Sequence, residues 1–102
     1  RECSLPDTFT TADWDRAVSF FGACAYCGRV PSTFHADHFI PVTNTDCPGT
    51  TPDNIIPACP SCNRSKSNHS PAAWLNRKFG ANYAAEILAR IQAYFAWVKS
   101  LE

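Results

Sequence analysis

Apolar residues at helical spacing predict a helix near each end of the chain. Over about 11–21 they recur at intervals of three and four, and a capping pattern precedes them, in which Thr10 is followed three residues later by Asp13. A second apolar stripe starts at Tyr83 and extends over about 83–100. We therefore expect two amphipathic helices, with their aromatic residues in the core.

A third helix is predicted just before the last one, over about 71–79. Ser70 followed by Pro71 combines an N-cap residue with a proline at the first helical position, and Gly80 is a common helix end. Asn82 is expected to cap the helix that follows.

The middle of the chain predicts two short strands. Residues 33–42 are rich in β-branched and aromatic side chains, but Pro41 removes a backbone donor, so the strand is expected to be short and distorted. Residues 54–58 supply a second strand, and Pro60 is placed to start a short helix. The turn formers at 43–53 predict an exposed loop. Together these elements predict an α+β fold.

Composition limits how so small a chain is stabilised. Its 102 residues predict a single domain, 1–102, which buries only about 60 to 68 per cent of the surface of its unfolded chain. Six cysteines and eight prolines suggest that cross-links or a metal ion add to hydrophobic burial. No apolar run reaches the roughly 20 residues that span a bilayer, so no membrane partner is expected.

Four of the cysteines form two C-x-x-C pairs. Tetrahedral zinc takes four thiolates and each pair supplies two, which leaves no position for substrate, so the predicted zinc ion is structural. The predicted ligands are Cys24, Cys27, Cys59 and Cys62. The alternative is two disulfides. It is disfavoured because the chain starts at Arg1 without a signal-like apolar run, a start that suggests an excised piece of a longer protein. Cys3 and Cys47 lie outside the pattern, and either free thiols or a disulfide between them remains open.

A second candidate site uses harder ligands. The oxygens of Asp37 and Asn63 suit magnesium or manganese, and His38, with an ordinary pKa near 6.5, can act as a general base. Adjacent residues of a regular strand point to opposite faces, so Asp37 and His38 can serve one site only if the backbone is distorted.

These residues resemble the three motifs of the HNH endonuclease family, in its four-cysteine zinc-containing branch. Asp37-His38 resembles the first motif, 53–56 the second and 62–66 the third, in the family's order. The resemblance implies a ββα-metal (His-Me finger) core over about 24–68. It also implies hydrolysis of DNA phosphodiester bonds in the cytoplasm, by a protein of bacterial or phage origin.

The resemblance also implies a role for each site residue. His38 would be the general base, Asp37 and Asn63 the ligands of a catalytic Mg²⁺ or Mn²⁺ ion, and Asn54 the residue that braces the loop holding His38. The third motif carries Asn63 where the family name implies histidine, and His69 is the less favoured third-motif residue. His35 is expected to be solvated, with a contact to the metal site or phosphate as the alternative.

Basic residues are concentrated although the formal net charge is zero. Residues 54–85 contain no acid. We expect the basic side chains of this segment to contact DNA phosphates. Such contacts position a protein on DNA without recognising the base sequence. The basic residues of the segment are Arg64, Lys66, Arg77 and Lys78.

Two other functions fit part of the pattern. A non-catalytic zinc module that binds DNA or a protein needs the thiols but not Asp37, His38 and Asn63 together. A secreted, disulfide-stapled interaction domain would hold no zinc. The occurrence of all three polar residues around the thiols favours the nuclease, and leaves sequence preference, nicking against double-strand cleavage, biological setting and oligomeric state open.

Overall fold

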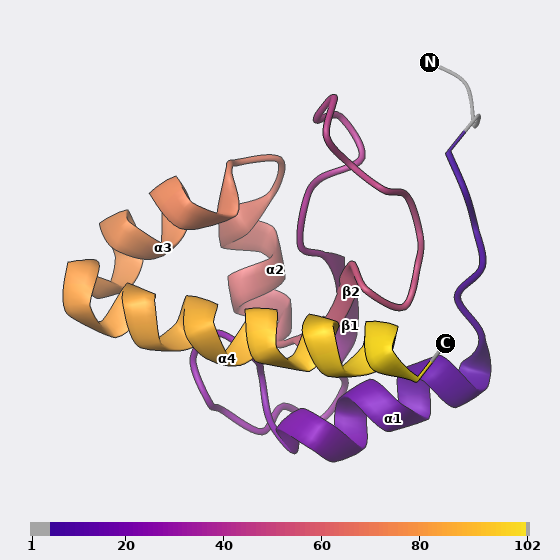
Figure 1. Ribbon diagram of the computed structural model, residues 1–102. Coiled ribbons are helices and arrows are strands. Elements are labelled where there is room, and N and C mark those ends of the chain that lie inside the picture. Colours follow the sequence, from indigo (N-terminus) through magenta and orange to yellow (C-terminus); the bar gives the residue numbers. More distant parts are fainter. Residues whose placement is uncertain (1–4, 102) are drawn as a thin grey trace.

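The protein is described here by a computed structural model that covers residues 5–101 and has the expected α+β architecture (Figure 1). In chain order the elements are α1 (Thr11–Phe21), β1 (His35–His38), β2 (Ile55–Ala58), α2 (Pro60–Lys66), α3 (Pro71–Phe79) and α4 (Ala81–Ser100). None of the helices in this part of the chain is both long and apolar enough to cross a membrane.

The predicted helix start at Thr10 is confirmed by its hydrogen bonds. The Thr10 hydroxyl oxygen accepts a bond of 3.2 Å from the backbone N–H of Asp13, whose carboxylate accepts one of 2.9 Å from the backbone N–H of Thr10. The two bonds satisfy donors that a helix start otherwise leaves unpaired. Gly22 ends α1 in the left-handed region, with φ of 66°.

The two strands form an antiparallel pair that is only four residues long. His38 lies opposite Ile55, and His35 lies opposite Ala58. All four residues of β2 are buried, and β2 packs against α1. This places β2 inside the molecule, whereas β1 carries polar side chains toward the candidate site.

Helix α4 begins earlier than expected. Gly80 is both the last cap of α3 and the first cap of α4, with φ of 87° and ψ of 156°, a backbone conformation that favours glycine. Asn82 therefore lies inside the first turn of α4, and the prediction that it caps this helix is wrong. The buried stripe starts at Ala84, and Tyr83 is 52% exposed, because the helix turns position 83 outward.

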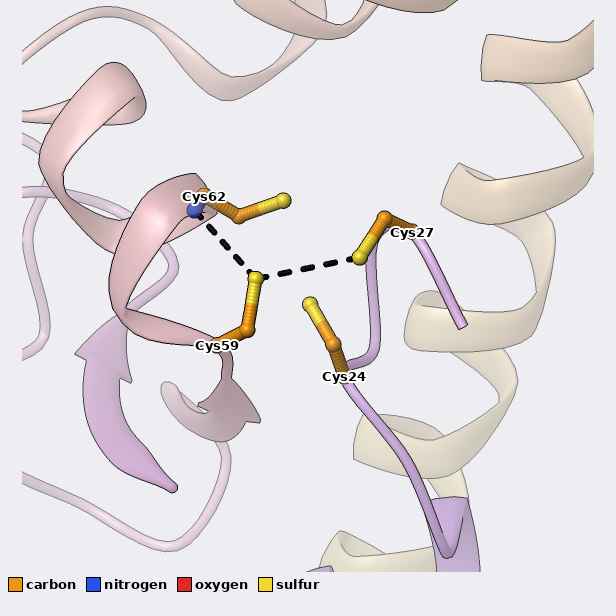
Figure 2. A group of neighbouring side chains, drawn as sticks. All are labelled: Cys24, Cys27, Cys59 and Cys62. Carbon is orange, nitrogen blue, oxygen red and sulfur yellow. Dashed lines mark hydrogen bonds between the residues drawn. The ribbon is translucent and has the colours of Figure 1, made fainter. Parts of the chain in front are cut away.

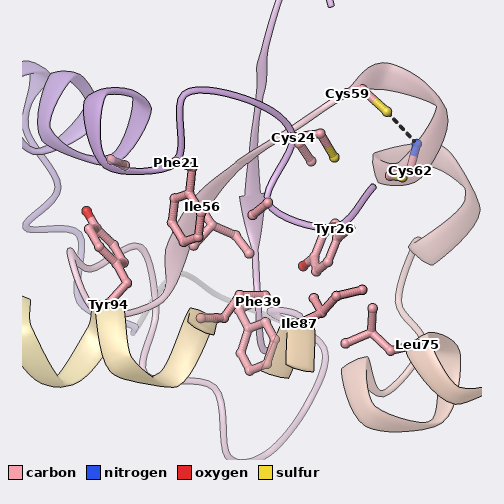
Figure 3. Close-up of a cluster of buried hydrophobic side chains, with 14 of the residues drawn as sticks. Phe21, Cys24, Tyr26, Phe39, Ile56, Cys59, Cys62, Leu75, Ile87 and Tyr94 are labelled. Atoms are coloured by element: carbon pink, nitrogen blue, oxygen red, sulfur yellow. Dashed lines mark hydrogen bonds between the residues drawn. The ribbon is translucent and has the colours of Figure 1, made fainter. Parts of the chain in front are cut away.

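One cluster of buried side chains joins α1, β2, α3 and α4 (Figure 3). Aromatic rings supply much of it: Phe21 packs against Tyr94, and Tyr26 packs edge-on against Trp74 with ring centroids 5.0 Å apart. Such contacts between aromatic rings stabilise the fold by more than the burial of their apolar area alone. The expectation that the aromatic residues of the two helices lie in the core is confirmed for Phe21 and Tyr94, whereas Phe20 and Trp97 stack on each other at the surface.

The long loop before β2 is only partly the exposed loop that its composition predicts. Its outer residues 42–46 are exposed, but Cys47 and Gly49 are buried. The returning half is attached to the segment before α1, since Thr50 donates a backbone hydrogen bond of 2.9 Å to Pro6 and pairs in parallel with Asp7. A Cβ atom at Gly49 would lie 2.4 Å from the Pro6 oxygen, so only glycine allows this approach.

Of the two cysteines outside the zinc pattern, one lies within the described residues. Cys47 is a buried free thiol whose sulfur accepts a hydrogen bond of 3.3 Å from the Gly49 backbone. Cys3 lies outside the described residues.

Candidate metal centre and catalytic pocket

Four thiols converge from two separate turns (Figure 2). Cys24 and Cys27 lie in the turn after α1, which is closed by a hydrogen bond of 3.0 Å from the Gly28 N–H to the Cys24 carbonyl. Cys59 caps the start of α2, and its sulfur accepts a bond of 3.4 Å from the backbone N–H of Cys62. The two turns therefore present four sulfurs to one point.

The thiol geometry fits zinc. The four ligand atoms lie within 4.8 Å of one another, and the sulfurs of Cys27 and Cys59 are 3.7 Å apart. A tetrahedron with zinc–sulfur bonds of about 2.3 Å has sulfurs about 3.8 Å apart, whereas a disulfide bond is about 2.0 Å long. Cys24, Cys59 and Cys62 are buried. The predicted four-cysteine cluster is confirmed as a potential metal site.

Electrostatics of the thiol cluster also favour a cation. The hydrogen bond between Cys24 and Cys62 lowers the pKa of Cys24 to about 4 and raises that of Cys62. Within this pair the Cys24 thiol therefore gives up its proton more readily than the Cys62 thiol. Metal binding replaces these protons, because zinc takes cysteine as thiolate.

Asp37 lies in the interior of the site, where two donors meet one of its oxygens. Oδ2 accepts a short hydrogen bond from the Tyr26 hydroxyl and lies 3.3 Å from the Lys66 ammonium. Burial raises the pKa of Asp37, and the charge of Lys66 and the Tyr26 hydrogen bond oppose that shift. No described hydrogen bond or ion pair engages Oδ1.

The position of Lys66 differs from the prediction that it contacts DNA. It was expected to reach DNA phosphates, but it is fully buried, and its ammonium donates a hydrogen bond of 2.9 Å to the His38 carbonyl oxygen. The cause is the packing of α2 across β1, which turns this last helical position toward the strand. Arg64, Arg77 and Lys78 are exposed, so their phosphate contacts stay a prediction.

His38 lies beside Asp37, and both line the same open pocket of about 330 Å³. Its Nε2 atom is 2.9 Å from the Thr50 hydroxyl oxygen. Burial lowers the pKa of His38, although the neighbouring Asp37 carboxylate opposes the shift. At neutral pH the imidazole is therefore uncharged and able to accept a proton.

Asn63 reaches the pocket from α2. Its Nδ2 atom lies 3.1 Å from His35 Nδ1, so His35 is engaged with a site residue and only half-exposed, unlike the solvated residue that we expected. The signal in the sequence is that His35 lies two residues before Asp37, so on a regular strand the two side chains share the face that meets the site. The Asn63 side-chain oxygen makes no described hydrogen bond. His69, the less favoured candidate, is exposed and does not line the pocket.

Asn54 is buried and connects the two ends of the long loop. Its side-chain oxygen accepts a bond of 2.8 Å from the Ile40 N–H, and its Nδ2 donates to the carbonyls of Ile40 at 3.1 Å and Gly49 at 3.0 Å. Its backbone carbonyl accepts a further bond of 2.8 Å from Phe39. This geometry agrees with a bracing position just after His38.

Sequence reasoning missed two residues of the site, Tyr26 and Thr50. Tyr26 lies between two zinc-ligand candidates, and its aromatic character alone indicates only a core residue. Thr50 lies in a loop of turn formers, and its contact with His38 depends on the return of that loop. No spacing rule connects either residue to the pocket.

Comparisons with known proteins agree with the motif positions. Residues 24–69 match the family model described as HNH endonuclease. A protein of Bacillus subtilis (strain 168), named "SPbeta prophage-derived putative HNH endonuclease YoqL", is 28% identical over 108 residues, which cover 92% of this chain and 44% of that protein. Protein ea31 of Escherichia phage lambda is 35% identical over 49 residues, which cover 48% of this chain and 17% of that protein.

The chain thus spans less than half the length of either relative. No solved structure matches it at a significant level.

Proposed function

Because residues 24–69 make this chain a member of the HNH endonuclease family, we propose that it hydrolyses phosphodiester bonds of DNA with one divalent metal ion. The observation that carries the proposal is the convergence of Asp37, His38 and Asn63 on one pocket beside the four-cysteine cluster. The bacterial and phage relatives support extending the proposal to the cytoplasm of a bacterial cell.

Asp37 and Asn63 are the proposed ligands of the metal ion. Each has one side-chain atom anchored, Oδ2 of Asp37 and Nδ2 of Asn63, and one oxygen without a described hydrogen bond. Two such oxygens suit Mg²⁺ or Mn²⁺, which keep several water ligands. Bound there, either ion would polarise a phosphate oxygen as a Lewis acid and would stabilise the departing 3′ oxygen.

His38 is the proposed general base. In the proposed tautomer the Nε2–H of His38 donates to the Thr50 hydroxyl oxygen, which leaves the lone pair of Nδ1 available to a water molecule. Nδ1 takes a proton from that water while the water attacks phosphorus in line with the 3′ oxygen. The bond between phosphorus and the 3′ oxygen breaks, and the departing oxygen takes a proton from solvent water, so the products are a 5′-phosphate and a 3′-hydroxyl group.

The exposed basic residues of α2 and α3 extend the proposed site along DNA. Arg77 and Lys78 line a second shallow pocket with Ser65 and Trp74, and Arg64 is exposed on the adjoining helix. Guanidinium and ammonium groups bind phosphate oxygens without reading base sequence. We therefore propose a binding mode that weakens as salt concentration rises.

A plasmid assay tests the proposal. Zinc-loaded protein is incubated with supercoiled plasmid, with and without Mg²⁺ or Mn²⁺, beside His38→Ala and the matched control His69→Ala. Loss of a general base is expected to lower the cleavage rate by about 10²- to 10⁴-fold, and His69→Ala is expected to cleave like the parent. Equal rates for His38→Ala and the parent would refute the role of His38. A parent that binds the plasmid without cleaving it would favour the non-catalytic zinc module.

A further inference from the structure

The two segments that carry the thiol pairs also meet at one carboxylate oxygen, Oδ2 of Asp37. Tyr26 lies between Cys24 and Cys27, and Lys66 lies in the last turn of the helix that Cys59 caps. Both side chains reach Oδ2 of Asp37. The segment that contains each thiol pair therefore also contains one of the two residues that hold the Asp37 carboxylate.

The turn that carries Tyr26 is fixed tightly enough to aim its hydroxyl group. The backbone N–H of Ala25 donates a bond of 2.9 Å to the Pro57 carbonyl in β2, and Gly28 closes the turn behind it. The Tyr26 ring is 2% exposed and packs edge-on against Trp74, with an interplanar angle of 80°. A buried ring between such neighbours has no alternative rotamer without repacking the core.

The hydroxyl group has no other described partner than Asp37. A buried tyrosine hydroxyl needs a hydrogen bond, and a buried carboxylate needs donors. The pairing satisfies both groups through Oδ2 and leaves Oδ1 without a described hydrogen bond, on a residue that lines the pocket. Carboxylates that bind metals are oriented in this way by neighbouring donors.

We infer that Tyr26 is a positioning residue that couples the four-cysteine centre to the proposed catalytic metal site, by holding Asp37 in the orientation that ligates the ion. The inference rests on the proposed function, because it takes Asp37 as a metal ligand. Lys66 provides the second hold on the same oxygen from α2.

The test measures Mn²⁺ affinity rather than cleavage alone. Electron paramagnetic resonance of free Mn²⁺ gives the dissociation constant for zinc-loaded parent, Tyr26→Phe and the control Tyr94→Phe, which removes a hydroxyl group from a ring just as buried. Zinc content and thermal unfolding are measured on the same samples. Tyr26→Phe is expected to keep its zinc and weaken Mn²⁺ binding about tenfold or more, and Tyr94→Phe is expected to bind Mn²⁺ like the parent.

A second measurement uses the parent protein alone and therefore does not depend on the folding of any variant. The hydrogen-bonded Tyr26 hydroxyl proton is expected to exchange slowly with water and to give a downfield proton resonance in the parent. Absence of that resonance would overturn the inference, because the hydroxyl would then not be held by Asp37.

The other outcomes are equally decisive. Unchanged Mn²⁺ affinity in Tyr26→Phe overturns the inference and leaves the proposed function standing. Loss of zinc from Tyr26→Phe also overturns it, since the hydroxyl would then support the turn rather than the carboxylate. A parent that neither binds Mn²⁺ nor cleaves DNA overturns the proposed function and the inference together.

Discussion

The two candidate metal sites of this protein are built in opposite ways. The thiol cluster takes four identical soft ligands from two short turns and is mostly buried. The pocket of Asp37, His38 and Asn63 is open, mixes oxygen with nitrogen, and draws on neighbours from across the chain. Tyr26, Thr50 and Lys66 are among the neighbours whose contacts hold it.

This difference separates stability from chemistry. A closed four-thiolate site contributes its binding free energy directly to folding, because the unfolded chain does not present the same site. The open pocket leaves ligand positions unfilled, so the surrounding residues must orient each group. Removal of the first site should therefore unfold the molecule, and changes at the second should alter activity or local packing.

Zinc removal is expected to have the largest effect. Structural zinc contributes about 10 to 16 kcal/mol of apparent binding free energy at pH 7, which exceeds the net stability of most small domains. Titration with a strong chelator, followed by far-ultraviolet circular dichroism, should show loss of helix. Cys47→Ser, which changes a buried thiol outside the cluster, should keep its zinc. Unfolding by reductant but not by chelator would instead favour the disulfide alternative.

Lys66→Met is expected to have the next largest effect. It leaves the buried Asp37 carboxylate without its cation and the His38 carbonyl without its donor, and breaking a buried ion pair costs about 3 to 5 kcal/mol. Urea unfolding of the zinc-loaded protein measures the loss. The exposed control Lys78→Met should change the free energy of unfolding by less than about 0.5 kcal/mol. Equal effects of the two substitutions would mean that Lys66 is not buried in solution.

The pH dependence of cleavage is expected to show a smaller change. Burial lowers the pKa of His38 below the ordinary 6.5, and the base works only when neutral. The midpoint of the falling rate should therefore lie below pH 6.5, and the rate should drop about tenfold per pH unit below that midpoint. A profile of kcat/KM from pH 5 to 8 measures this limb. A midpoint above pH 6.5 would contradict the effect of burial on His38.

The smallest effect is expected at the exposed basic residues. Arg77→Ala should leave the free energy of unfolding nearly unchanged and reduce the slope of log binding constant against log salt by about 1. Fluorescence anisotropy with a short DNA duplex at several salt concentrations measures that slope. Lys99→Ala, at the exposed end of α4, serves as the control. An identical slope in the two variants would argue against α3 as part of the DNA surface.

The sequence predicts those parts of the fold that depend on local chemistry. The start of α1 follows from Thr10 and Asp13, and the thiol cluster from two C-x-x-C pairs, because each needs only a few adjacent residues. The two strands and α2 follow from proline and β-branched residues in the same local way. Local rules fail at Asn82, since Gly80 adopts a backbone conformation that starts α4 at Ala81, two residues earlier than expected.

The candidate site is less predictable because its contacts join distant segments. Position 66 reads as an exposed charge, and only the packing of α2 across β1 turns it inward. Thr50 meets His38 only when the loop returns, and Tyr26 meets Asp37 only when the thiol turn docks on β2. The motif residues are visible in the sequence, whereas the residues that orient them depend on the complete fold.

The attachment of Thr50 to the segment before α1 bears on how this protein can be shortened or transplanted. The family match covers residues 24–69, yet the partner of the His38 ring is held from outside that range, by Pro6 and Asp7. An engineer who grafts only the matched segment onto another protein would transfer both proposed metal sites without this tether. The smallest portable unit therefore begins no later than residue 6.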